Sequence, residues 1–163
     1  MKACAFTGHR RIESRHMQKL PELVLRAVQY AYDNGCRKFI TGGAIGFDTL
    51  AAREVIKFRI SHPDVSLVLA LPCIEQDAKW NSAQKNAYSF TLAVADEVIY
   101  TSEVYTKNCM AIRNRYLADK ADLLIAYVGR SNSGAAQTVR MAESMNKRIY
   151  NLYPTVVKTL RED

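Results

Sequence analysis

The sequence predicts one α/β domain in which helices cover both faces of a mostly parallel sheet of about six strands. Short apolar runs alternate along the chain with longer segments whose apolar residues recur at helical spacing. Residues 65–71 are almost continuously apolar, which is typical of a strand buried on both faces of a parallel sheet. With 163 residues, of which 48% are hydrophobic and 24% charged, the chain has the composition of one globular domain with a core.

The first predicted strand covers residues 2–6 and ends in the turn 7–11. A helix is expected from about residue 14 or 16 to residue 33, because apolar side chains recur there at helical spacing: Leu20, Leu23, Val24, Ala27, Val28 and Ala31. Pro21 lacks a backbone N–H and is tolerated in a first turn, so the true start can lie later than residue 16. Asn34 and Gly35 end the helix.

The second unit has the same order of elements. Residues 36–41 form a predicted strand, residues 41–48 form a glycine-rich loop, and a helix is expected from residue 47 to residue 59. The apolar residues of this helix form a wide surface that indicates packing against a sheet: Leu50, Ala51, Ala52, Val55 and Ile56. A break at 61–64 precedes the strand 65–71, which ends at Pro72.

The second half of the chain continues the alternation after an irregular segment, 72–82. One helix is expected where four residues share a helical face: Ala87, Phe90, Thr91 and Val94. A second is expected over 108–120, and a third begins at Ala135, with Val139, Ala142 and Met145 on one face. Strands are expected over 97–100, 122–128 and 148–152, with a loop at 129–134. The domain is predicted to span residues 1–153, and residues 154–163 form a polar, partly frayed C-terminal tail.

Composition limits the classes of function. The formal net charge of +7 and the isoelectric point near 9.3 favour an anionic partner such as a nucleotide or nucleic acid. The basic residues are spread along the chain, so a solvated basic surface is the alternative. No apolar run approaches the length of a membrane span, and the N-terminus enters a strand-like run, so no membrane association and a cytoplasmic location are expected. The four cysteines are single and the three histidines do not repeat at ligand spacing, so buried reduced thiols and no metal site are expected.

Three loops are predicted to meet at one edge of the sheet, because each follows a strand and precedes a helix: 7–11, 41–48 and 129–137. Glycines in the loop 41–48 allow close approach of a ligand to the backbone, and free N–H groups at a helix start attract phosphate. The alternative is a tight structural turn. Ser133 and Gly134 begin a second helix, where Ser133 either caps the helix or contacts a ligand, two roles that are compatible.

Several polar side chains near this edge are candidates for ligand contact. Arg113 and Arg115 are two positions apart on a helix, so only one of them is expected to face inward, with Asn114 beside it. Asp48 is a candidate for a ribose hydroxyl or, weakly, for catalysis, against the alternative that it stabilises its own helix start. His9 is a second weak catalytic candidate, and Trp80 either stacks a base at the rim or packs in the core.

The motifs, taken together, resemble a known superfamily. Gly8-His9-Arg10, Gly42 to Asp48, Arg113-Asn114-Arg115 before residues 121–126, and Ser133 to Thr138 occur in the order found in the SLOG superfamily, which joins DprA-type DNA-processing proteins with the LOG phosphoribohydrolases. The segments 76–80, 100–105 and 113–119 are most similar to the small stand-alone YpsA-like proteins. The resemblance implies a Rossmann-like domain that binds nucleotides or nucleotide-derived ligands, and it places Gly8, Arg10, Gly42, Gly43, Gly46, Asp48, Arg113, Ser133, Gly134 and Thr138 at ligand positions.

One difference separates the chain from the LOG enzymes. Gln137 stands near the place where those enzymes carry a catalytic glutamate, and a glutamine cannot donate or accept a proton in that role. The leading hypothesis is therefore the binding of a small phosphorylated ligand, a nucleotide or nucleotide derivative, with no obligatory cofactor. Nucleotide hydrolysis at an N-glycosidic or phosphoester bond and DprA-like single-stranded DNA binding are the alternatives; nucleic acid is not favoured, and a homo-oligomer is left open.

The full set of residues predicted to bind the ligand combines the loop residues, the helix residues and the single tryptophan: Gly8, His9, Arg10, Thr41, Gly42, Gly43, Ala44, Gly46, Asp48, Trp80, Arg113, Asn114, Ser133, Gly134, Gln137 and Thr138.

Overall fold

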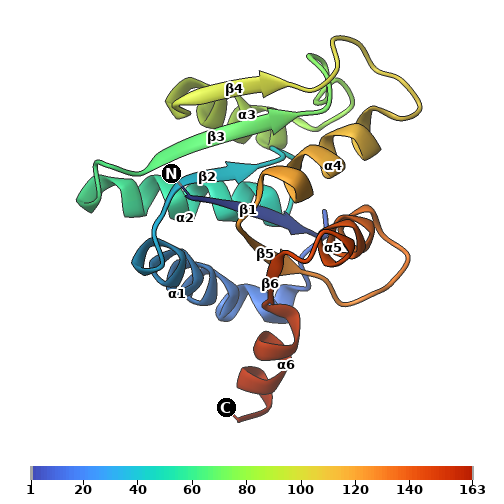
Figure 1. The fold of residues 1–163 in the computed structure, drawn as a ribbon. Coiled ribbons are helices and arrows are strands. Elements are labelled where there is room, and N and C mark those ends of the chain that lie inside the picture. The colour runs from blue at the N-terminus through green and yellow to red at the C-terminus, as the bar shows by residue number, and fades with distance from the viewer. Residues whose placement is uncertain (1, 163) are drawn as a thin grey trace.

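The computed structural model describes residues 2–162 and, within them, forms one sheet of six parallel strands, which confirms the predicted fold class (Figure 1). The strands are β1 (Lys2–Gly8), β2 (Cys36–Thr41), β3 (Ser66–Leu71), β4 (Glu97–Tyr100), β5 (Leu123–Tyr127) and β6 (Arg148–Asn151). Their order across the sheet is β4-β3-β2-β1-β5-β6, and every neighbouring pair is parallel.

The helices form two layers around the sheet. They are α1 (Leu20–Asp33), α2 (Phe47–Ser61), α3 (Ser82–Val94), α4 (Cys109–Lys120), α5 (Gly134–Ser144) and α6 (Tyr153–Glu162), and a short 3-10 helix, η1 (Ser14–Gln18), precedes α1. Pro21 lies in the first turn of α1, so the later helix start that it indicated is confirmed. The helices α1, α2 and α3 cover one face of the sheet, and α4 and α5 cover the other (Figure 1).

The strands divide their side chains between the two faces, because successive residues of a strand point in opposite directions. Large residues such as Phe6, Phe39 and Tyr127 pack toward α1 and α2. The opposite core contains many alanines, including Ala3 and Ala5, which let α4 and α5 lie close to the sheet.

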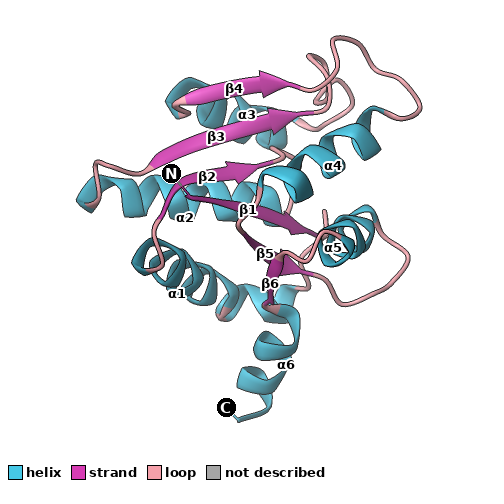
Figure 2. Cartoon of the chain, in the orientation of Figure 1, coloured by secondary structure: helices cyan, strands magenta, loops and turns pink. Residues whose placement is uncertain are grey.

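The strand order fixes where a ligand can lie. The chain moves from β1 through β2 and β3 to β4 on one side and then returns to place β5 on the other side of β1. The loops that follow β1 and β5 therefore lead to opposite faces, and a crevice opens between them at the carboxyl ends of the strands. Figure 2 shows the six strands running in the same direction, with these loops at one edge.

Two local expectations are wrong. Phe90 was expected to share one face of α3 with Thr91, but Thr91 is buried together with Tyr88, whereas Phe90 is 56% exposed. The expected frayed tail is instead the helix α6, whose Val156 is fully buried against the core of the α1 and α2 face. The polar residues of this segment lie on the outer side of an amphipathic helix.

Replacing Val156 with alanine is expected to lower the free energy of unfolding by about 2 kcal/mol, because the side chain is buried and its loss leaves a cavity. Val157 is only partly buried, so Val157→Ala is the control and should cost clearly less. Urea unfolding measures both. Equal, small effects would mean that α6 does not pack as described.

The four cysteines are free and buried, as predicted. None of the helices in residues 2–162 is both long and apolar enough to cross a membrane.

Candidate functional site

A cavity of about 320 Å³ lies at the crevice between the loops that follow β1 and β5. We call it the arginine cavity. It is lined by the turn after β1, by the glycine loop (residues 41–48), by α4 and by the start of α5: Thr7, Gly8, His9, Arg10, Arg11, Ala44, Asp48, Met110, Arg113, Asn114, Leu117, Arg130, Ser133, Gly134 and Ala135. The predicted meeting of the three loops is therefore confirmed.

His9 connects the loops of the cavity through hydrogen bonds of its backbone and its ring. Its backbone N–H donates to the carbonyl of Tyr127, and its own carbonyl accepts from the N–H of Phe47. Its ring Nε2 accepts a hydrogen bond of 2.8 Å from the backbone N–H of Gly129, which places the ring proton of neutral His9 on Nδ1. Burial lowers the pKa of His9, and the nearby charge of Arg130 adds to this effect, so His9 is neutral near pH 7 and fixes the loop after β5.

Asp48 occupies the start of α2. Its Oδ2 accepts a hydrogen bond of 3.2 Å from the backbone N–H of Ala44, and the side chain is almost completely buried. The carboxylate thus takes a backbone N–H of the glycine loop that an external anion would otherwise use. The glycine loop contains its own anion.

Arg113 reaches from α4 into the same loop. Its Nη1 donates to the carbonyl of Gly42, and its Nε donates to Oδ1 of Asn114 at 3.0 Å. The amide of Asn114 in turn donates to the carbonyl of Gly134 at the start of α5. A chain of hydrogen bonds therefore connects the glycine loop to the loop after β5 through α4.

Asp48 and Arg113 are buried residues of opposite charge, and each influences the pKa of the other. Burial raises the pKa of Asp48 to about 6, against the opposing effects of Arg113 and of the Ala44 N–H. Burial likewise lowers the pKa of Arg113, while the charge of Asp48 opposes that shift. Each charge is therefore kept in the interior by the other.

The start of α5 remains open toward the cavity. Ser133 caps the helix by accepting a hydrogen bond of 3.1 Å from the N–H of Ala136, so the capping role predicted for it is confirmed. Gly134 and Ala135, the first two residues of the helix, line the cavity. Three exposed arginines line the same cavity: Arg10, Arg11 and Arg130. Positive side chains and a helix N-terminus together favour an anion.

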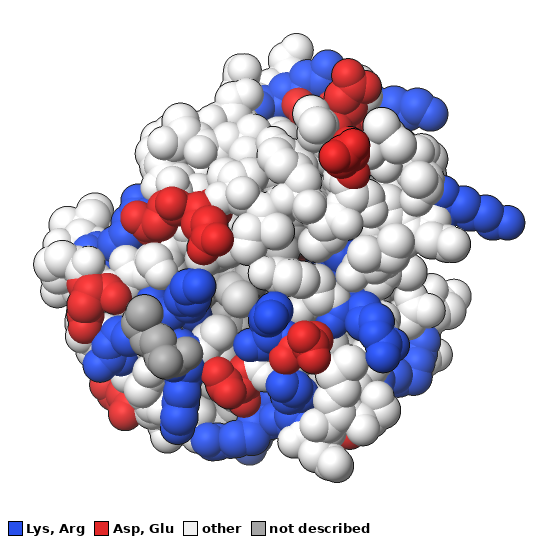
Figure 3. Space-filling model, turned by 45° about the horizontal axis from the view of Figure 1, so that its top comes forward, with Lys and Arg blue, Asp and Glu red and all other residues white. Residues whose placement is uncertain are grey.

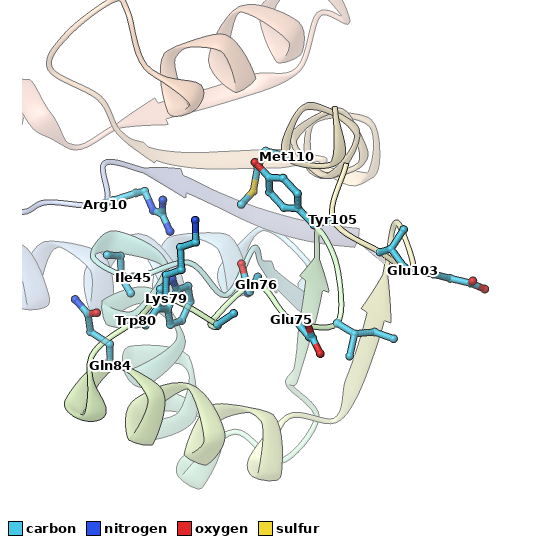
Figure 4. A pocket seen from close by; sticks show the side chains of 13 residues that line it. Arg10, Ile45, Glu75, Gln76, Lys79, Trp80, Gln84, Glu103, Tyr105 and Met110 are labelled. Carbon is cyan, nitrogen blue, oxygen red and sulfur yellow. The ribbon is translucent and has the colours of Figure 1, made fainter. Parts of the chain in front are cut away.

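A second cavity, of about 810 Å³, adjoins the first, and Arg10 and Met110 line both. We call it the aromatic cavity. Its other lining residues come from the glycine loop, from the segments after β3 and β4, and from α3: Ile45, Ile74, Glu75, Gln76, Ala78, Lys79, Trp80, Gln84, Glu103, Val104 and Tyr105. Figure 4 shows Trp80 and Tyr105 on different sides of this cavity, with Gln76 between them.

Comparison with known proteins identifies the family. The YpsA family model, described as the YspA SLOG family, matches residues 4–160. The chain belongs to the YpsA SLOG family.

Individual relatives agree with this assignment. An uncharacterized prophage-derived protein of Bacillus subtilis, YoqJ, is 27% identical over 158 residues, with 88% of each chain covered. Among solved structures, the DNA processing protein A (DprA) of Helicobacter pylori, described for its single-stranded DNA binding mode, matches with a TM-score of 0.63 and 18% identity over 91% of this chain. DprA of Streptococcus pneumoniae matches with a TM-score of 0.64 and 15% identity, also over 91% of this chain. The chain spans 63% and 49% of those two chains, and the likeness shows that they share its fold.

In this SLOG chain, most of the residues predicted to bind a ligand line one of the two cavities. Gly8, His9, Arg10, Ala44, Asp48, Arg113, Asn114, Ser133 and Gly134 line the arginine cavity, and Trp80 lines the aromatic cavity. The helical spacing predicted that only one of the two arginines faces inward, and the inward-facing one is Arg113, whereas Arg115 is exposed.

The other predicted residues lie outside both cavities. Gln137 is exposed on α5, and Thr138 is buried, where its hydroxyl donates to the carbonyl of Gly134. Thr41, Gly42, Gly43 and Gly46 shape the glycine loop: a Cβ on Gly43 would meet the side chain of Leu71, and one on Gly46 would meet the backbone of Arg10.

Sequence reasoning missed Arg11 and Arg130, although both lie in loops that it expected at this edge. Their place in the sequence could have identified them, because each is a basic residue in a loop between a strand and the next helix. It also missed the residues that surround Trp80, because their segments have no periodic pattern. Nowhere in residues 2–162 do three or more histidine, cysteine or acidic side chains gather closely enough to hold a metal ion.

Proposed function

We propose that this SLOG domain binds a nucleotide or a nucleotide-derived ligand, whose phosphate lies at the start of α5. The observation that carries the proposal is the arginine cavity, which is lined by a helix N-terminus and by Arg10, Arg11 and Arg130 at the switch point of the sheet. Ligands of open α/β sheets bind at this position, and backbone N–H groups at a helix start suit a phosphate. Family membership supports the same interpretation.

The charge balance of the cavity supports a phosphate rather than a neutral group. Four arginines line it, and the one acidic side chain among its lining residues, Asp48, is already engaged with Ala44 and Arg113. The positive charge of the exposed arginines is therefore available to an incoming anion. The phosphate is expected beside α5 rather than in the glycine loop, where Asp48 occupies a backbone donor.

Replacing Arg130 with alanine is expected to weaken nucleotide binding by about tenfold to 100-fold, because a hydrogen bond to a charged group contributes roughly 1.5–3 kcal/mol. Thermal unfolding with a panel of nucleoside mono- and diphosphates tests this. A ligand at 100 times its dissociation constant should stabilise the wild-type fold by about 2.7 kcal/mol. Arg115→Ala removes an exposed arginine of α4 outside the cavity and should leave affinity unchanged. If no nucleotide stabilises the protein, the proposal is wrong.

Two other functions are tested with the same samples. Single-stranded DNA binding is motivated by the exposed arginines of the rim and by the shared fold with DprA. On the face seen in Figure 3, however, basic side chains are interspersed with acidic ones instead of forming a continuous track. An oligonucleotide shift that weakens steeply with salt would favour this function over the proposed one.

Nucleotide hydrolysis is motivated by Asp48, a carboxyl group with a raised pKa that lines the cavity. Release of free base or phosphate from a nucleoside monophosphate, lost in Asp48→Asn, would favour hydrolysis. Stable binding without release favours a binding domain.

A further inference from the structure

We propose that the aromatic cavity is a second subsite for the same ligand, and that it takes a nucleobase bearing an exocyclic amino group. The inference rests on the proposed function, because it assumes that the phosphate of this ligand lies in the arginine cavity. Arg10 and Met110 line both cavities, so one ligand can extend from one into the other. The volume of the aromatic cavity, about 810 Å³, is within the range of small-molecule sites.

The charges of the two cavities indicate which end of the ligand lies where. The arginine cavity has an excess of positive side chains. In the aromatic cavity, Arg10 and Lys79 are balanced by Glu75 and Glu103. A phosphate therefore gains more in the arginine cavity, and the aromatic cavity suits an uncharged ring.

The walls of the aromatic cavity suit a planar ring. Trp80 is held in place by an edge-to-face contact with Tyr88, with ring centroids 5.1 Å apart, and leaves part of its surface exposed to the cavity. Tyr105 is 74% exposed and lies on another side of the cavity (Figure 4). Exposed aromatic faces of this kind stack nucleobases.

Gln76 gives the cavity a preference for a hydrogen-bond donor. It is 9% exposed, and its Nε2 donates to the carbonyl of Gly43 at 3.2 Å, which fixes the orientation of the amide. Its Oε1 is buried and accepts no hydrogen bond from the described residues. A buried acceptor without a donor is unfavourable, and an amino group of the ligand would satisfy it. Because the oxygen is covered, contact with a ligand requires a small shift of the side chains that surround it.

The single tryptophan of the chain provides a direct measurement. We expect adenosine, guanosine or cytidine 5′-monophosphate to change the fluorescence of Trp80 on binding, whereas ribose 5-phosphate binds more weakly and leaves the emission unchanged. Unchanged emission at saturation with every nucleotide that binds by calorimetry would overturn the aromatic subsite and leave the proposed function intact. If calorimetry detects neither the nucleotides nor ribose 5-phosphate, both proposals fail.

Calorimetry of variants separates stacking from a structural effect. Tyr105→Ala should weaken binding of the best nucleotide about 5- to 150-fold without affecting ribose 5-phosphate, since stacking is lost and the phosphate site is untouched. Ile60 is 82% exposed on α2 and outside both cavities, so Ile60→Ala is the matched control with no change. Equal affinity of wild type and Tyr105→Ala for the nucleotide would contradict the stacking role.

The role of Gln76 is tested with ligand pairs that differ in the amino group: adenosine against purine riboside, or guanosine against inosine, as 5′-monophosphates. Wild type should prefer the amino compound about tenfold, and Gln76→Leu should lose the preference. A preference that persists in Gln76→Leu, or that wild type lacks, would overturn the assignment of the amino group.

Discussion

Replacing Arg113 with methionine should lower the free energy of unfolding by roughly 3–5 kcal/mol at pH 8, because it leaves a buried carboxylate without its compensating cation. Arg113 is 6% exposed, and its guanidinium donates to the carbonyl of Gly42 and is the main electrostatic influence that lowers the pKa of Asp48. Methionine has a similar length and no charge, so the loss reflects the missing charge and its hydrogen bonds rather than a cavity. Urea unfolding gives the free energy.

The effect of Arg113→Met should depend on pH. The pKa of Asp48 is raised to about 6 in the folded protein from an ordinary value of 3.8, so the folded state holds this proton more tightly than the unfolded state. Asp48 therefore destabilises the fold increasingly as the pH rises from about 4 to above 6. Removal of Arg113 raises its pKa further, which makes the variant weakest at pH 8 and closest to wild type at pH 5.

A second substitution completes the test. Asp48→Asn in the Arg113→Met background removes the orphaned charge and should recover much of the lost stability at pH 8 but little at pH 5. Arg115→Met, at the exposed arginine of the same helix, should change the free energy by less than about 0.5 kcal/mol. A loss of the same size at both pH values, or no recovery in the double variant, would show that the charges of Asp48 and Arg113 do not depend on each other.

The regular elements could be predicted from the sequence because each has a local pattern. The apolar run 65–71 and the helical spacing in α1 are dictated by burial of a strand on two faces and of a helix on one. The meeting of three loops follows from strand direction alone. The polar composition of residues 154–162 led to the wrong prediction of a frayed tail, because α6 buries only a narrow stripe of its surface around Val156.

The internal arrangement of the site could not be predicted in the same way. Asp48 and Arg113 are far apart in the sequence, and only the return of the chain from β4 to β5 brings α4 over the glycine loop. In the sequence, the glycines of that loop are equally consistent with a phosphate site and with tight packing. In the structure, neighbouring protein atoms occupy the space that a Cβ would need at these glycines. The glycines therefore indicated that some group lies close to the loop backbone, but not whether this group is a ligand or another part of the protein.

Gly46 is the position where that close approach is tightest, and Gly46→Ala should lower the free energy of unfolding by about 3 kcal/mol or more. Gly46 precedes α2 with φ of 81° and ψ of −123°, a conformation that costs a residue with a Cβ roughly 1–3 kcal/mol. A Cβ there would also overlap the backbone carbonyls of Arg10 and His9, which cannot turn away as a flexible side chain can. Thermal and urea unfolding measure the loss.

Gly134→Ala is the matched control for Gly46→Ala. Its added Cβ would have Asn114 Nδ2 as its nearest neighbour, at an ordinary 3.6 Å, so stability should change by less than about 1 kcal/mol. The two variants also distinguish an effect on the packing of the loops from an effect on ligand contact. Gly46 holds the turn after β1 against the glycine loop, so its substitution should weaken nucleotide binding through misplaced Arg10, whereas Gly134 lines the cavity itself. If Gly46→Ala unfolds like wild type, the two loops are not held together by this contact, and the hydrogen bonds of His9 and Arg113 maintain the shape of the arginine cavity.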